Sequence, residues 1–393
     1  MPALSGSDIL AIIEEICEFG PRWMGSMGAD RTVDFIAGQF QASGLTVERQ
    51  PFRYLAYKPG KASIIVNGRP LPCEPIALAQ PTAGVLKAPL VSGGQGLPED
   101  LAALNANGRA LNGSIVVSEN LRSFVAYPHA EAAGAAGFVS LSTLPGNIIR
   151  CGSARLDRKP GKIPAVAIGG DDSRWVVAEL EKGRHLEASI KVEGQFSEEK
   201  GYNVIGRLGN PAGERILVTA HYDSFWNGVH AMDNAAGCAT VIILSWILAA
   251  TIEQAFEFVV FGGEESGCWG SSSYVQASNA SLETIKAVVN FDTFGSNRSQ
   301  VEVGATPDLA EFCRKVAGER EVRVDCWNIP PRPASDQHCF VERGVPAIWL
   351  ANCGADQRYH TPLDVPAEMS PAKLEISAGL AMAFIRGLTG IQV

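Results

Sequence analysis

Histidine and carboxylate side chains follow three apolar segments of this sequence, each at the point where a buried strand would end. They are His221 and Asp223, Glu264 and Glu265, and Asp292. In an open α/β sheet, the carboxyl ends of the strands form the edge at which ligands bind. Burying several unpaired carboxylates is costly, and a metal ion supplies the compensating charge. The pattern therefore predicts a metal site at one edge of a sheet.

Two further residues fit this site. Asp233 stands just before a predicted helix, and His360 lies in a Tyr-His-Thr-Pro stretch. Two histidines and three carboxylates suit two divalent cations that share one carboxylate, and zinc takes such ligands while leaving a position open for water. Paired metals activate that water, and an additional carboxylate that is not a ligand can serve as general base. Taken singly, Asp233 also reads as a helix cap and His360 as a turn residue, so the joint occurrence carries the prediction.

The elements that must position these residues are apolar strands alternating with helices, which indicate an α/β fold. A mostly parallel sheet with helices on both faces is typical of such a pattern. From Asn203 onward we expect strands at 203–208, 215–220, 256–261, 285–291 and 346–350, and helices at 234–250, 270–278, 308–317 and 371–387. Near the N-terminus we expect helices at 8–19 and 30–43 and a strand at 45–52.

A stretch rich in proline and glycine separates these parts. Its expected elements are short strands at 63–66, 115–118, 137–141 and 163–168 and a helix at 128–134. We therefore predict two domains: a discontinuous catalytic domain of residues 1–55 and 195–393, and a β-rich insertion of residues 60–190. A lobe inserted just ahead of His221 would act as a lid over the active site.

Composition excludes several classes of protein. The 393 residues are 46% hydrophobic and 19% charged with a net charge of −9, which excludes a disordered chain and argues against nucleic acid as a partner. Nine cysteines without a CxxC motif predict reduced thiols and no zinc ribbon. The first 19 residues carry acidic residues inside an apolar helical pattern, which predicts an amphipathic helix rather than a signal peptide. We therefore expect a cytoplasmic protein.

The uncharged segment 234–252 has a borderline length for crossing a bilayer. It opens with Asn-Ala-Ala-Gly and contains Cys238, Thr240 and Ser245. We expect a buried core helix and no membrane contact.

The residues at the strand ends resemble the M28 family of zinc metallopeptidases with two metal ions. The five motifs occur in the family's order: His221-Tyr-Asp223-Ser, Ala231-Met-Asp233-Asn-Ala-Ala-Gly237, Phe261-Gly-Gly-Glu264-Glu265-Ser-Gly267, Asn290-Phe-Asp292 and Tyr359-His360-Thr-Pro-Leu-Asp364. The turn Gly20–Ser26 and the loop Ser335–Phe340 are also similar to segments of that family. Within the insertion, residues 113–117, 132–138 and 163–168 resemble the protease-associated domain of many members.

The resemblance implies a role for each residue. His221 and Asp292 would bind one metal, Glu265 and His360 the other, and Asp233 would bridge them. Glu264 would be the general base, and Asp223 would orient the imidazole of His221. The implied cofactor is a pair of divalent ions, with zinc expected and cobalt or manganese as alternatives. The implied activity is that of an aminopeptidase acting on peptides or small amides.

Alternatives stay open at this point. A carboxypeptidase on the same site would need an arginine for the substrate carboxylate, for which Arg332, Arg343 and Arg358 are candidates. A non-catalytic scaffold is disfavoured because every ligand position is filled. A glutaminyl cyclase-like transferase is disfavoured by the insertion. Gln337 stands where the family often has histidine, with His338 next to it. The sequence leaves open the roles of Gln337, His338 and His230. It also leaves open the oligomeric state, for which a homo-oligomer is one possibility.

Overall fold

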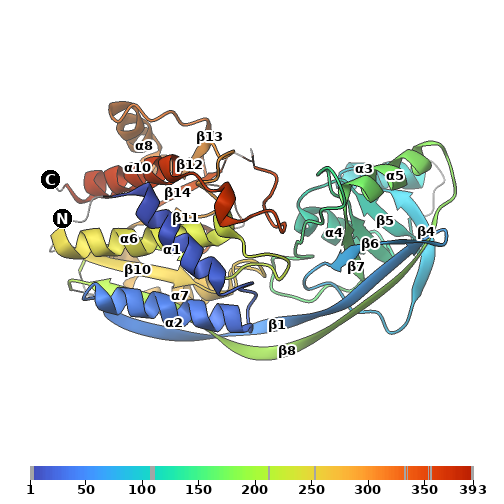
Figure 1. The fold of residues 1–393 in the computed structure, drawn as a ribbon, viewed down its shortest axis with the longest axis horizontal. Coiled ribbons are helices and arrows are strands. Elements are labelled where there is room, and N and C mark those ends of the chain that lie inside the picture. The colour runs from blue at the N-terminus through green and yellow to red at the C-terminus, as the bar shows by residue number, and fades with distance from the viewer. Residues whose placement is uncertain are drawn as a thin grey trace.

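The computed structural model describes residues 4–390 except 107–110, 211–212, 252–253, 332, 334, 353 and 355. Two long antiparallel strands, β1 (Thr46–Val66) and β8 (Glu187–Leu208), run side by side between two masses of structure (Figure 1). We call the mass that holds both chain termini the main part, and the mass formed between β1 and β8 the lobe. Every strand belongs to one continuous sheet that passes from the main part into the lobe.

The sheet of the main part is mostly parallel. Its strand order is β13-β12-β14-β11-β9-β10-β8. The parallel strands are β9 (Arg215–His221), β10 (Ala255–Phe261), β11 (Ile285–Phe291) and β14 (Ala347–Asn352). Beside them run the antiparallel β8 and β12 (Val301–Ala305), and β13 (Cys326–Asn328) pairs with β12. Every residue of β9, β10 and β14 is buried, and most of these residues are apolar.

Helices cover both faces of this sheet, which confirms the predicted α/β class. On one face lie α1 (Gly6–Glu18), α2 (Met27–Ala42), α6 (Ala236–Thr251), α8 (Pro307–Glu319) and α10 (Pro371–Thr389). On the other lie α7 (Trp269–Ala277) and the short α9 (Gln337–Val341). Successive residues of β9 serve opposite faces: Val218 packs in the first core and Leu217 in the second.

The apolar segment that required a membrane test is a core helix here. Residues 231–250 are long and apolar enough to cross a bilayer, and 94% of that apolar window is buried inside the protein. The helix contacts β9, β10, α1 and α2. The eight cysteines that the structure describes are all free, and Cys353 lies outside the described residues.

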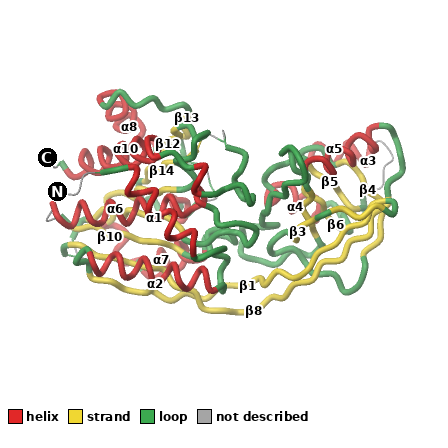
Figure 2. The backbone as a smooth tube through the Cα atoms, viewed as in Figure 1, coloured by secondary structure: helices red, strands yellow, loops and turns green. Residues whose placement is uncertain are grey.

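The lobe consists of short strands connected by helices, and most of its strands are parallel. Its strands β4 (Leu86–Ser92), β5 (Ile115–Ser118), β6 (Gly137–Ser140) and β7 (Ala165–Ile168) run parallel, with β3 (Cys73–Pro75) antiparallel at the edge. Its helices are α3 (Pro98–Ala106), α4 (Ser123–Ala132) and α5 (Gly170–Glu181) (Figure 2). The short β2 (Arg69–Leu71) pairs with β1. Two hydrophobic clusters, separate from the core of the main part, hold the lobe together.

Several boundaries differ from the sequence expectations. We expected a strand at 45–52, but β1 continues to Val66 with one register shift between Pro59 and Ala62. Proline is tolerated because over most of its length β1 pairs only with β8, so it is an edge strand there. Helix α4 begins at Ser123, not at Pro128, which lies inside it. The elements β4, α3, α5, β12, β13 and α9 were not predicted, because they are short or lack a strong apolar period.

Arg22 joins the N-terminal turn to the segment that follows β9. Its side chain is fully buried. The guanidinium donates to the main-chain oxygens of Tyr222 (2.8 Å) and His230 (2.9 Å), and also to that of Val229. The turn 20–26 therefore fixes the loop that carries Asp223 and leads into Asp233.

We predict that Arg22→Met lowers the free energy of unfolding by about 3–5 kcal/mol, because three buried oxygens lose their donor and each unsatisfied group costs about 1–3 kcal/mol. Urea denaturation of the metal-free protein measures this. Arg49→Met is the matched control. Arg49 is half exposed and pairs with the exposed Asp34, so its loss should cost less than about 1 kcal/mol. Equal losses in the two variants would contradict the anchoring role of Arg22.

Candidate metal centre

The seven residues named from the sequence all lie at one edge of the main sheet. His221 is the last residue of β9, and Asp292 directly follows β11. Glu264 and Glu265 lie in the loop after β10, and His360 lies in the loop after β14. Asp233 lies in the short turn η1 (Ala231–Ala235) that precedes α6. The carboxyl ends of parallel strands meet at one edge, and this brings residues far apart in sequence into one site.

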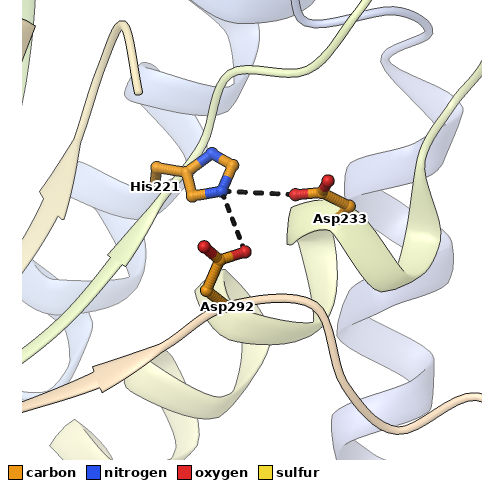
Figure 3. Close-up of side chains that lie close together, drawn as sticks. All are labelled: His221, Asp233 and Asp292. Carbon is orange, nitrogen blue, oxygen red and sulfur yellow. Dashed lines mark hydrogen bonds and ion pairs between the residues drawn. The ribbon is translucent and has the colours of Figure 1, made fainter. Parts of the chain in front are cut away.

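His221, Asp233 and Asp292 form a first trio. The His221 Nε2 atom lies 3.3 Å from Asp233 Oδ1 and 3.4 Å from Asp292 Oδ1. Figure 3 shows the imidazole directed between the two carboxylates. Thr293 Oγ1 also donates to Asp292 Oδ1, at 2.6 Å. The three ligand atoms are close enough to hold one metal ion.

Asp233, Glu265 and His360 form a second trio. The His360 Nε2 atom lies 3.0 Å from Asp233 Oδ2 and 3.1 Å from Glu265 Oε2. Asp233 therefore directs one carboxylate oxygen to each trio. Such an arrangement suits two metal ions with a shared carboxylate between them.

The chemistry of the residues fits a metal in both trios. All five side chains are buried, the most accessible being Asp292 and His360, each 7% exposed. Asp233 Oδ1, Glu265 Oε1 and His360 Nε2 make no hydrogen bond although they are buried. Unpartnered buried polar atoms are costly, and coordination of a cation by histidine and carboxylate would satisfy them.

Asp223 supports this site in two ways. Its main-chain oxygen lies 3.1 Å from His221 Nδ1, so that nitrogen carries the proton and the Nε2 lone pair faces the carboxylates. Its carboxylate accepts the amide hydrogens of Glu264 (3.1 Å) and Glu265 (3.2 Å). The same carboxylate also lies 3.6 Å from His221 Nδ1, so Asp223 contacts the ring whose orientation the sequence assigned to it.

Asp364 is a supporting residue to which the sequence assigned no role. Its carboxylate accepts the amide hydrogens of Met232 (2.7 Å) and Asp233 (3.1 Å) and so fixes the turn that presents the shared carboxylate. In the sequence, the only sign of this supporting role was the position of Asp364 at the end of the Tyr359–Asp364 motif.

The site is strongly electronegative. Burial alone would lower the pKa of His360, but Glu265 and Asp233 raise it to about 9. Burial would also lower the pKa of His221, but Glu264 and the neighbouring aspartates raise it well above its ordinary value. Burial raises the pKa of Glu265 to about 7 and that of Glu264 well above its ordinary value. The protein alone thus concentrates negative charge where cations would bind.

Glu264 stands outside both trios among the described residues and faces a cavity of about 230 Å³. The cavity lies between the main part and the lobe, with Glu265, Asp292 and His360 on its wall. Its apolar lining includes Leu121, Phe124, Leu156, Phe225, Trp349 and Tyr359. A reactant in this cavity would meet the metal ligands, Glu264 and lobe residues together.

The arginines of this cavity are not those expected from the sequence. Arg122 and Arg150, both from the lobe, line it. Arg358 is buried against Asp356 and Glu368, and Arg343 is exposed elsewhere. Arg332 lies outside the described residues.

The three residues left open by the sequence also stand apart from the trios. Gln337 is buried, and its Oε1 accepts from Asn290 at 2.8 Å. His338 pairs with Glu342 and is 40% exposed. His230 Nε2 lies 3.0 Å from Asn227 Oδ1, and burial lowers its pKa to about 3. None of the three lines the cavity described above.

Comparison with known proteins supplies the family context. Residues 203–385 match Peptidase family M28. Aminopeptidase YwaD of Bacillus subtilis (strain 168) is 25% identical over 93% of this chain and 81% of its own length. An aminopeptidase of Pseudomonas aeruginosa (strain UCBPP-PA14) is 28% identical over 70% of this chain and 54% of its own length, so this chain spans about half of that relative.

Among solved structures, BSAP, a zinc aminopeptidase from Bacillus subtilis, has the same fold. It superposes with a TM-score of 0.77 at 24% identity, over 98% of this chain and 95% of that chain. Taken with the buried trios, these matches identify the chain as a hydrolase, a metallopeptidase that is similar to Peptidase family M28 over residues 203–385.

Proposed function

We propose that this protein is an aminopeptidase with two co-catalytic metal ions. The observation that carries the proposal is the pair of trios that share Asp233, with Glu264 beside them and outside both. His221 and Asp292 would hold one ion, Glu265 and His360 the other, and Asp233 both. Zinc is the expected metal, because histidine and carboxylate suit it and because BSAP is described as a zinc aminopeptidase. When bound, such a pair polarises the scissile carbonyl and makes water a stronger nucleophile.

Glu264 is proposed as the general base. It faces the cavity and is free to exchange protons, because it belongs to neither trio among the described residues. It would take a proton from the attacking water and deliver it to the leaving amine. Its raised pKa suits the second step, since a carboxyl group that holds its proton more firmly is matched to donation near neutral pH.

The shape of the cavity supports the removal of single N-terminal residues. The cavity is enclosed on one side by lobe residues such as Leu121, Phe124 and Leu156, so a chain end would enter more readily than a folded protein. The named relatives are aminopeptidases. We further propose that residues 1–55 and 195–393 are the catalytic domain and that residues 60–190, which resemble a protease-associated domain, cover its site.

The cavity also offers a binding partner for a carboxylate group of the substrate. Arg122 is exposed at the cavity and precedes α4 directly, where the helix N-terminus also favours negative charge. A short peptide bound by its amine at the metal site would direct its C-terminal carboxylate toward this arginine. The same arginine would serve a carboxypeptidase, which is the competing function.

Metal binding should stabilise the fold. Adding zinc to chelator-treated protein should raise its melting temperature, because a ligand at 100 times its Kd adds about 2.7 kcal/mol to folding. His360→Ala should reduce this gain, since it removes a ligand of the second trio. His338→Ala, at a partly exposed histidine outside the site, should leave the gain intact. A melting temperature indifferent to zinc, cobalt and manganese would argue against any metal site here.

The two adjacent glutamates should separate by role. Glu264→Gln should keep the metal content and reduce kcat by about 10²–10⁴-fold, the usual contribution of a general base. Glu265→Gln should lower the metal content instead, as measured by elemental analysis after dialysis. If Glu264→Gln empties the site while Glu265→Gln keeps it full, the two assignments are reversed.

Substrate polarity is tested with one dipeptide in three forms: free, C-terminally amidated and N-blocked. An aminopeptidase should cleave the first two and reject the third. Arg122→Gln should raise KM for the free dipeptide by about 10-fold, the equivalent of one charge-assisted hydrogen bond of roughly 1.4 kcal/mol, and should leave the amide unaffected. Arg174→Gln, at an exposed lobe arginine outside the cavity, is the control. Cleavage of the N-blocked form alone would favour the carboxypeptidase.

A further inference from the structure

A short lobe segment, Arg150–Ser153, contacts the main chain of two residues of the second trio. The Ser153 hydroxyl donates to the main-chain oxygen of Glu265 at 2.6 Å. The Cys151 amide donates to the main-chain oxygen of His360 at 2.9 Å. Both ligands that are specific to the second trio are thus held by the lobe.

Arg150 extends these contacts along the His360 loop. Its guanidinium donates to the main-chain oxygens of Tyr359 (2.8 Å) and Gln357 (2.5 Å). The loop after β14 therefore takes its conformation partly from a residue of the lobe. Hydrogen bonds from a charged donor are stronger than those from a neutral donor, so this attachment is substantial.

Apolar packing closes the same junction. Phe225 of the main part and Cys151 and Leu78 of the lobe lie in one buried cluster with Trp23. The Phe225 ring lies 4.5 Å from the imidazole of His360, centre to centre. Moving the lobe away would break this cluster together with the hydrogen bonds described above.

The first trio is held differently. The main-chain oxygen of Asp223 contacts the His221 ring, and Thr293 contacts Asp292. Asp364 holds the turn that carries Asp233. These supporting residues all belong to the main part, as do the hydrogen-bond partners of His221 and Asp292 within the described ranges.

We propose that the segment Arg150–Ser153 positions the ligands of the second trio, so that docking of the lobe sets the metal affinity of that trio and leaves the first trio unaffected. The inference rests on the proposed two-metal function. It makes Ser153 a positioning residue that acts through Glu265. Loss of partners one step removed from a metal commonly costs 10–100-fold in affinity, roughly the effect expected here.

Ser153→Ala tests the inference in two backgrounds that each leave one trio complete. In Asp292→Asn only the second trio keeps all its ligands, and in Glu265→Gln only the first does. Calorimetric titration of the metal-free proteins with zinc should show binding weakened by about 10–100-fold when Ser153→Ala is added to Asp292→Asn. Adding it to Glu265→Gln should change nothing.

Two further variants separate positioning from general damage. Ser173→Ala removes another buried lobe hydroxyl, one that donates to the main-chain oxygen of Gly169 and accepts from the amide of Ser142, and should leave both affinities unchanged. Ser153→Thr keeps a hydroxyl and should restore part of the affinity. If Ser153→Ala does not fold, Arg150→Met, which removes the contacts to Gln357 and Tyr359, takes its place with the same expectation.

Equal weakening in both backgrounds, or none in either, would overturn the inference. Failure of the proposed function has a different result, because wild-type protein would then bind no zinc or cleave no free-amine peptide. A wild type that binds two ions and is active, with Ser153→Ala unchanged in both titrations, would refute the positioning role alone.

Discussion

The arrangement of this site depends on one buried carboxylate placed between two imidazoles. Asp233 directs one oxygen toward His221 and the other toward His360, and its side chain is almost inaccessible to solvent. Burial would raise its pKa, but the two histidines hold the pKa below its ordinary value. A charge buried in this way is stable only if its surroundings are fixed. Much of the main part can be understood as the means of fixing them.

The parallel sheet supplies that rigidity. The strands β9, β10, β11 and β14 end at the same edge and are packed between helices on both sides. His221 ends β9, and Asp292 and Glu265 closely follow β11 and β10, so these three side chains lie beside strands that cannot shift without disturbing the core. The supporting contacts are short and local to this edge. Asp223 holds the glutamate loop, Asp364 holds the turn of Asp233, and Arg22 anchors the segment between them.

The lobe adds a second source of order. It joins the main part through the long ribbon of β1 and β8, but its closest approach to the metal ligands is the segment Arg150–Ser153. The lobe shares a buried apolar cluster and several hydrogen bonds with the main part, and these contacts hold it in place over the site. The lobe thus forms part of the cavity wall and supports the ligands at the same time. Substrate access and metal affinity would accordingly depend on the same contacts.

The sequence by itself determined the α/β class and most strands of the main sheet, and it singled out the side chains that meet in both trios, whereas their division into two sets was implied only by a family resemblance. This was achievable because buried strands have an apolar pattern and because His221, Asp292 and the glutamates follow such strands directly. Local patterns do not report which parts of the chain meet. The long β1, the parallel sheet of the lobe and the arginines of the cavity were therefore missed or misplaced.

Only the tertiary structure decided how the residues are supported. It showed that Asp223 holds His221 through its main-chain oxygen and the glutamate loop through its carboxylate. It also brought Ser153 to Glu265 and Cys151 to His360, across separations of more than one hundred residues. The physical reason is that these contacts are made to main-chain atoms, which every residue carries. The path of the folded chain decides which donor reaches each main-chain oxygen. The type of side chain at the accepting residue therefore does not indicate the donor.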